Sequence, residues 1–262
     1  MEKKRIHRNG ILWCVIVALL MLLFQRAIGI VARNIADMFT YDTLDPDGAY
    51  LWNIVHHTVM MFLALAAILI LKKVFGLEFG LGIGDRKVGK KFIAVYTVVL
   101  VGITLIVHVL MMISGSLPVY DFPLNRRNIM GTLCFQLFLT GPAEELLYRA
   151  LPITIIVSAL GRSTNVKWGI TLETTIAAFL FAIAHAKWSL FPFTFKADCF
   201  QLLYAFAQGI IAGKAYQDSH SIIYPMLLHS ISNVGKSTLF RTFLKRHQLK
   251  IALGTGSTIL TG

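Results

Sequence analysis

Seven stretches of this chain are apolar for long enough to cross a lipid bilayer. A transmembrane helix needs about 20 consecutive, mostly apolar residues. The stretches that meet this rule lie at about 10–32, 50–71, 92–114, 128–157, 168–187, 198–216 and 221–240. Backbone polar groups inside lipid must be paired within their own segment, so each stretch is expected to be a helix. The sequence therefore predicts an all-α, polytopic transmembrane helix bundle of about seven spans, within a range of six to eight.

The charge of the chain fits a multi-pass integral membrane protein better than a nucleic-acid-binding protein. The formal net charge is +12, but 56% of the residues are hydrophobic and only 15% are charged. Lys and Arg cluster in connections such as residues 72–91, where they bind lipid head groups and set topology. We expect membrane lipids as partners and no nucleic acid. In a bacterial host the protein would lie in the cell membrane.

One membrane domain, residues 1–262, accounts for the whole sequence. There is no internal repeat, low-complexity tract or soluble segment. The basic N-terminus and the apolar run that follows are typical of a signal peptide, but Gln25 and Arg26 stand where a small-residue cleavage site would be. We interpret the run as a retained first helix.

Ionisable residues inside the apolar spans mark the candidate functional site, in a region of about 128–240. Each such residue costs several kcal/mol unless it is paired or faces water. The candidates are Glu144, Glu145 and Arg149 in the fourth span, His185 in the fifth, and His229 and Asn233 in the seventh.

Helical geometry separates these candidates by role. Positions i and i+4 share a face of a helix, whereas neighbouring positions differ by about 100°. Glu145 and Arg149 are therefore expected to pair, which leaves Glu144 directed elsewhere, into the bundle. His229 and Asn233 likewise share a face and can converge on one oxygen atom.

These residue types together suit the hydrolysis of an amide bond. The reaction needs a base for water, an acid for the leaving nitrogen, and hydrogen-bond donors for the oxyanion. Glu144 with His185 is assigned to hold and deprotonate the water, and Glu144 then protonates the leaving amine. His229 and Asn233 are assigned as the oxyanion donors.

The motifs resemble those of the CPBP family, the CAAX proteases and bacteriocin-processing enzymes also called Abi. They stand in this sequence as Glu-Glu-x-x-x-Arg (Glu144, Glu145, Arg149), Phe-x-x-x-His (Phe181, His185) and His-x-x-x-Asn (His229, Asn233). The resemblance implies intramembrane endopeptidase activity on a membrane-associated or lipidated peptide. Substrates would be prenylated CAAX tails, or signalling and bacteriocin-type peptides in a bacterium. The chain departs from the eight-helix pattern of the CAAX-cleaving members because a final hydrophobic span is missing.

Whether a metal takes part is left open by the residues themselves. Glu144, His185 and His229 form a donor set that also suits zinc with an open position for water. No His-Glu-x-x-His spacing is present, so the sequence does not choose. The resemblance implies glutamate-activated water without a cofactor, and that is our expectation.

Two other function classes remain as alternatives. A transporter or channel would use the buried charges as an ion path, but it predicts inverted repeats that this sequence lacks. A non-catalytic immunity or scaffold protein would use them only as a structural network between helices.

The remaining polar residues of the spans are interpreted as helix-packing or snorkelling groups. They are Gln25, Arg26, His56, His57, His108 and Glu173. Gly209 and Gly213 have the G-x-x-x-G spacing that suits close packing of helices within the bundle.

Overall fold

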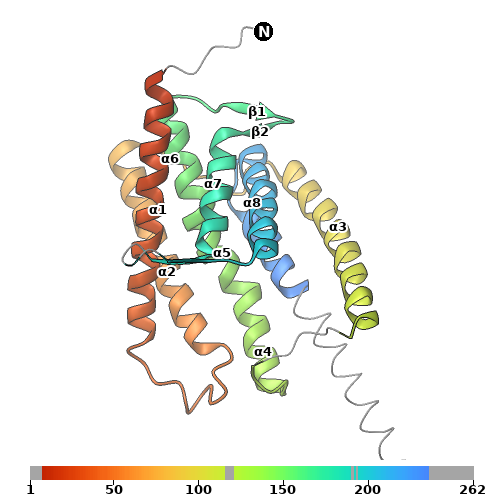
Figure 1. Cartoon of the computed structure of the whole chain (residues 1–262). Coiled ribbons are helices and arrows are strands. Elements are labelled where there is room, and N and C mark those ends of the chain that lie inside the picture. The colour runs from red at the N-terminus through yellow and green to blue at the C-terminus, as the bar shows by residue number, and fades with distance from the viewer. Residues whose placement is uncertain (1–7, 116–120, 190–191, 193, 236–262) are drawn as a thin grey trace, which may run out of the picture.

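The computed structural model describes residues 8–115, 121–189, 192 and 194–235, and most of them are helical (Figure 1). The prediction of a mainly helical chain is confirmed, with two short β-hairpins in addition. The helices are α1 (Arg8–Ala36), α2 (Leu51–Phe75), α3 (Arg86–Ile113), α4 (Arg126–Phe135), α5 (Gly141–Glu145), α6 (Leu151–Leu160), α7 (Leu172–Ala184), α8 (Cys199–Ser219) and a last helix over residues 223–235.

Three helices of the described part are long and apolar enough to cross a membrane. They are Leu12–Ala36 within α1, α2 and α3, and they coincide with the first three predicted spans. The protein is thus an integral membrane protein. α7 is apolar but has only 13 residues, so the total of seven spans stays a prediction. Most of the basic C-terminal tail lies outside the described residues.

The predicted fourth span is one long helical path, residues 126–160, with two π-helical turns in it. η1 (Gln136–Thr140) comes directly before the Gly141-Pro142 pair, and η2 (Leu146–Ala150) comes directly before Leu151-Pro152. Proline has no N–H for the ordinary i−4 hydrogen bond, so the hydrogen-bond pattern must change nearby. Such π turns recur at functional sites, and here they flank the two glutamates.

Two short hairpins correct the predicted fifth span and the segment that follows it. Residues 168–171 are not helical, because β1 (Asn165–Lys167) pairs with β2 (Ile170–Thr171) around a two-residue turn. Trp168 and Gly169 in that turn both have positive φ, as in the tight turns that favour hairpins. In the segment that follows, β3 (Lys187–Ser189) pairs with β4 (Thr194–Lys196).

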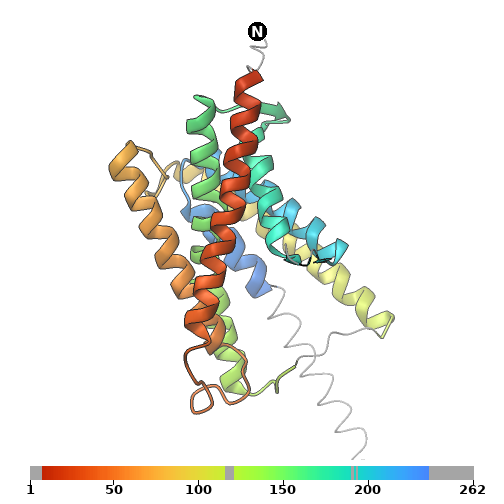
Figure 2. The ribbon, with the colours of Figure 1, turned by 60° about the vertical axis from the view of Figure 1, so that its left-hand side comes forward.

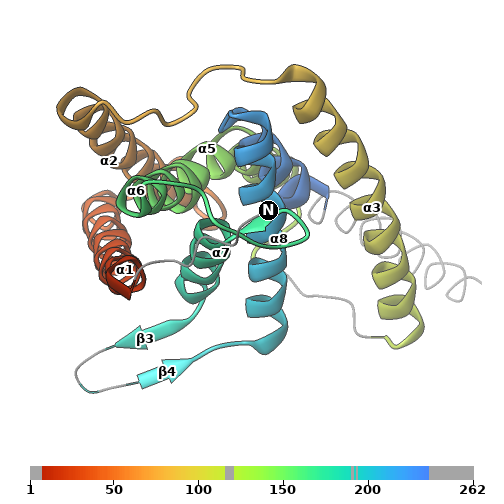
Figure 3. The ribbon, with the colours of Figure 1, turned by 90° about the horizontal axis from the view of Figure 1, so that it is seen from above.

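α7 and α8 pack side by side, as Figures 2 and 3 show, and small residues lie at their contact. A Cβ added at Gly209 would lie 2.8 Å from the Cα of Ala178, and one added at Gly213 would lie 2.8 Å from the Thr174 methyl group. The packing interpretation of the G-x-x-x-G spacing is confirmed.

The α5–α6 segment occupies the middle of the bundle, between the α1–α2 pair and the α7–α8 pair (Figure 3). Its side chains Leu147, Leu151 and Ile153 are buried in the main hydrophobic core. α3 stands further out and packs against α8 and Tyr224. The helix that carries both glutamates is therefore surrounded on several sides.

Candidate active site

Gly141 brings the glutamate helix close to the last helix. A Cβ at this position would collide with the backbone oxygen of Met226, and it would lie 2.6 Å from the Ser230 hydroxyl oxygen. Because the two backbones approach so closely, His229 on the last helix reaches the α5 side chains. Its Nδ1 lies 2.7 Å from Oε1 of Glu145.

Glu145 and Arg149 form the predicted ion pair. Nε of Arg149 lies 3.2 Å from Oε2 of Glu145, and neither side chain is exposed at all. The guanidinium carbon lies 3.8 Å from the centre of the Phe181 ring, a cation–π contact that suits a desolvated arginine. The pair is locked into the core and is not available to a substrate.

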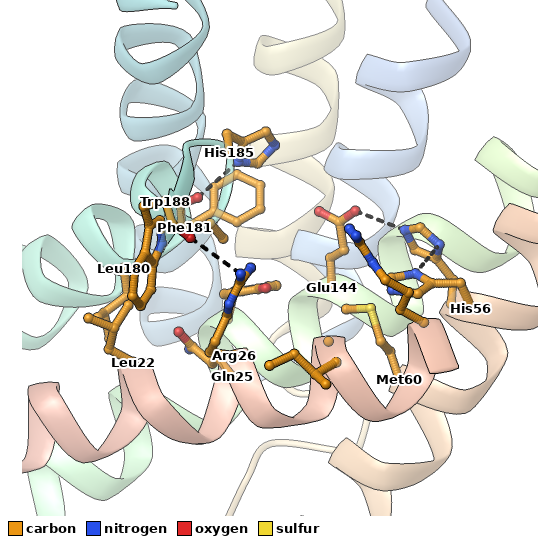
Figure 4. Close-up of a pocket in the computed structure, with 16 residues that line it drawn as sticks. Leu22, Gln25, Arg26, His56, Met60, Glu144, Leu180, Phe181, His185 and Trp188 are labelled. Carbon is orange, nitrogen blue, oxygen red and sulfur yellow. Dashed lines mark hydrogen bonds and ion pairs between the residues drawn. The ribbon is translucent and has the colours of Figure 1, made fainter. Parts of the chain in front are cut away.

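Glu144 points in another direction, into a cavity, and its side chain is 18% exposed (Figure 4). Its Oε1 lies 3.3 Å from Nε2 of His57 on α2. Its Oε2 lies 3.6 Å from Nε2 of His229. The carboxylate is thus held between two imidazoles from different helices.

The cavity has a volume of about 280 Å³, just below the usual range for small-molecule pockets. Its walls come from α1, α2, the α5–η2 segment, and α7 with the start of the β3–β4 hairpin. Polar groups on these walls are Gln25, Arg26, Arg33, His56, His57, Glu144, Tyr148, His185 and Trp188.

His185 lines the cavity at the end of α7, where it is the C-cap residue. Its Nδ1 lies 2.9 Å from the carbonyl oxygen of Phe181. The Phe181 ring contacts the rings of both His185 and His229, with centroid distances of 4.6 and 5.9 Å. Phe181 therefore packs against both predicted histidines.

The partners of the three histidines fix which ring nitrogen carries the proton. A carbonyl oxygen or a carboxylate can only accept a hydrogen bond. His57 and His185 each face a backbone carbonyl with Nδ1, and His229 faces Glu145. Each neutral ring thus carries its hydrogen on Nδ1. In such a neutral ring Nε2 presents only a lone pair, and in His57 and His229 this nitrogen faces Glu144.

Of the predicted site residues, Glu144 and His185 line the cavity, and Asn233 does not. It lies one turn beyond His229 and is half-buried, but it does not line the cavity wall. His229 is not part of that wall either, although its Nε2 lies 3.6 Å from Oε2 of Glu144. The oxyanion role of these two residues stays a prediction.

His57 is the residue that reasoning from sequence missed, because we interpreted it as a packing group. The signal was present, since it is an ionisable residue inside an apolar span. No spacing rule connects it with Glu144, which follows 87 positions later. Arg26 is also more than a snorkelling group, because it lines the cavity and donates a hydrogen bond to the carbonyl oxygen of Trp188.

The expectation of a reaction without a metal stays a prediction. Within the described ranges, no group of three His, Cys, Asp or Glu side chains could hold one ion. This includes the donor set Glu144, His185 and His229, which the sequence left as an alternative.

One family model matches the chain, over residues 126–235, and its description is type II CAAX prenyl endopeptidase Rce1-like. The matched region contains every predicted site residue. The comparison with curated proteins gave no match, and neither did the comparison with solved structures.

Proposed function

We propose, from the match of residues 126–235 to the type II CAAX prenyl endopeptidase Rce1-like family model, that this chain hydrolyses a peptide bond inside the membrane. The substrate is a membrane-associated or lipidated peptide or protein. The protein that does this is a multi-pass bundle of about seven spans. In a bacterial host its place is the cell membrane.

The observation that carries the proposal is the setting of Glu144. Its carboxylate is on the wall of a cavity, inside the family region, and histidine nitrogens lie 3.3 and 3.6 Å away. A carboxylate that is held in place next to solvent-sized space can bind and activate a water molecule. Glu145 is buried in its pair with Arg149, so it is the poorer candidate for the base.

In the proposed reaction one proton moves from the water to the leaving nitrogen, and Glu144 carries it. Glu144 takes a proton from the water, and the hydroxide adds to the carbonyl carbon of the scissile bond. Glu144 then gives the proton to the leaving nitrogen as the C–N bond breaks. His185 holds the water from another part of the cavity wall. His229 and Asn233 remain the proposed donors to the oxyanion, a role in which His229 carries a hydrogen on Nε2 and turns that nitrogen away from Glu144.

The cavity walls favour a substrate that arrives from the lipid. Apolar side chains Leu22, Ile30 and Leu180 line the cavity beside the charged groups. Prenylated CAAX tails, and signalling or bacteriocin-type peptides in a bacterium, both combine an apolar anchor with an extended peptide.

Cleavage by purified protein in lipid vesicles tests the proposal. Fluorogenic peptides with and without a prenyl group are incubated with wild type and with Glu144→Gln. We expect wild type to cut at least one peptide, and we expect Glu144→Gln to be slower by about 100- to 10,000-fold, the usual contribution of a general base. Full activity of Glu144→Gln would exclude the mechanism.

Two controls sharpen this experiment. Glu78→Gln changes an exposed glutamate that is paired with Lys72, and it should cleave like wild type. A strong chelator should leave wild-type cleavage unchanged. Loss of activity on chelation with recovery on adding zinc would contradict a metal-free reaction.

A further inference from the structure

A histidine outside the Rce1-like region completes the surroundings of Glu144. His57 lies on α2, whereas the family match begins at residue 126. Its Nε2 is 3.3 Å from Oε1 of Glu144, the shorter of the two imidazole contacts to this carboxylate. The side chain is 13% exposed and lines the cavity. The contact is therefore at the cavity wall and is largely shielded from bulk solvent.

The His57 ring is fixed in orientation by two further contacts. Nδ1 donates a hydrogen bond to the carbonyl oxygen of Asn53 over 2.9 Å. The ring meets the Phe135 ring edge-on, with a centroid distance of 4.9 Å and an interplanar angle of 76°. Because both the position and the tilt of the ring are set, Nε2 is aimed at Glu144 by the fold itself.

The contact between His57 and Glu144 requires a proton between them. Nδ1 already carries a hydrogen, so Nε2 of a neutral ring would present only a lone pair to the carboxylate. Two acceptors at 3.3 Å repel each other. A hydrogen on Nε2, which makes the ring an imidazolium, turns the contact into a charge-assisted hydrogen bond.

We propose that His57 is a positioning residue for the hydrolysis, and that it acts through Glu144. Its Nε2–H binds Oε1, holds the carboxylate in the ionised form, and directs Oε2 toward the reacting water. Each carboxylate oxygen has two lone pairs, so this bond leaves room for the water. His57 keeps its proton throughout, and the proton that Glu144 moves comes from the water and ends on the leaving amine. The inference rests on the proposed function.

Replacement of His57 by alanine should lower kcat and leave KM nearly unchanged. Misplacement of a catalytic group by about 1 Å costs on the order of 100-fold in rate, and we expect a loss of this size. The site of the lost ring opens into the cavity, so added imidazole can occupy it. We expect imidazole to restore part of the kcat of His57→Ala, an effect that a purely structural role would not produce.

His108→Ala is a matched control. His108 also lies in a long apolar helix, α3, and its Nδ1 also bonds to the carbonyl four residues earlier, Thr104, at 2.6 Å. It is not among the residues of the cavity wall. We expect His108→Ala to keep wild-type kcat and to show no response to imidazole.

Two conservative variants distinguish a role of His57 in positioning Glu144 from a role in packing alone. His57→Gln keeps an N–H donor for Glu144 and should retain more activity than His57→Ala. His57→Phe keeps the ring and its contact with Phe135 but cannot donate, so it should be as slow as His57→Ala and resist rescue. Thermal unfolding in detergent would check that every variant is folded.

The outcomes distinguish this inference from the proposed function. Cleavage by wild type together with wild-type kcat in both His57→Ala and His57→Phe would overturn the role of His57 and leave the endopeptidase in place. Loss of activity in His57→Ala without imidazole rescue, with His57→Phe fully active, would show packing in place of positioning. Absence of cleavage by wild type on all peptides would instead count against the proposed function.

Discussion

At the scale of single residues, the most demanding interaction is the Glu145–Arg149 pair, because both charges are fully buried. Removal of one partner from such a pair leaves an uncompensated charge and costs about 3–5 kcal/mol. We predict that Arg149→Met lowers the thermal midpoint of unfolding in detergent strongly. The double variant Glu145→Gln with Arg149→Met should recover part of that loss, since it removes the stranded carboxylate.

An exposed pair with the same spacing provides the comparison. Lys214 and Asp218 are also i and i+4 on one helix, with an N–O distance of 2.9 Å, but both remain partly exposed. Exposed pairs of this kind contribute about 0.3–0.5 kcal/mol. Asp218→Asn should therefore unfold almost like wild type. A similar loss in Asp218→Asn and Arg149→Met would show that burial is not the cause.

The same residues show how far reasoning from sequence reaches at this scale. The Glu145–Arg149 contact follows from helix periodicity alone, and it is present. The contact of Glu144 with His57 joins two helices 87 positions apart. No local pattern encodes that distance, because it depends on how α2 packs against α5.

At the scale of elements, the approach of α5 to the last helix depends on Gly141. A methyl group there would collide with the Met226 backbone, which cannot give way as a flexible side chain can. We predict that Gly141→Ala lowers stability by about 1–3 kcal/mol, the usual cost of overpacking. It should also lower kcat, because the shift moves His229 away from both glutamates. Thermal unfolding and peptide cleavage measure the two effects.

Gly102 on α3 serves as the control for this substitution. A Cβ at Gly102 meets no other atom within 4 Å, and alanine favours a helix more than glycine does. Gly102→Ala should equal or exceed wild type in stability and keep full activity. Equal losses in both variants would mean that Gly141 is not a packing contact.

Helices could be predicted from the sequence where the length of an apolar stretch is enough to determine them. The first three spans appear as α1, α2 and α3 with ends a few residues from the predicted ones. The fifth span began too early in the prediction, because Val166, Ile170 and their apolar neighbours suit a hairpin as well as a helix. Trp168 and Gly169 both adopt positive φ, which forms the tight turn of the hairpin. A tryptophan in that conformation is not expected from sequence.

At the scale of the whole molecule, Asp47 joins the loop between α1 and α2 to the start of α4. Its carboxylate accepts hydrogen bonds from the side chains of Asn125, Arg127 and Asn128. The Asn128 amide above all, with Arg127 and Asn125, holds the pKa of Asp47 below its ordinary value. Helices that are far apart in the sequence are thus fastened together at this end of the bundle.

The contribution of Asp47 to stability should depend on pH in one direction. Because the folded pKa is lower than the unfolded one, the stabilisation is fully present above the ordinary aspartate pKa of about 3.9 and is lost as the pH falls through the lower folded value. We predict that Asp47→Asn lowers the thermal midpoint at neutral pH and that this difference shrinks in acid. Exposed Asp42→Asn, measured in the same series, should match wild type throughout. A difference for Asp47→Asn that is constant with pH would contradict the assignment.

The site also has a consequence for how proteins of this kind diversify. The residues proposed to react lie in the stretch that matches the family model, whereas α1 and α2 supply a large part of the cavity wall. If the proposed function is right, most of the reacting groups and most of this wall are encoded by separate segments, with His57 as the exception. We expect that exchange of residues 8–75 between two such proteins, with His57 retained, changes which peptide is cut while hydrolysis continues. Preference for a substrate would then be inherited through a part of the gene that catalytic motifs do not describe.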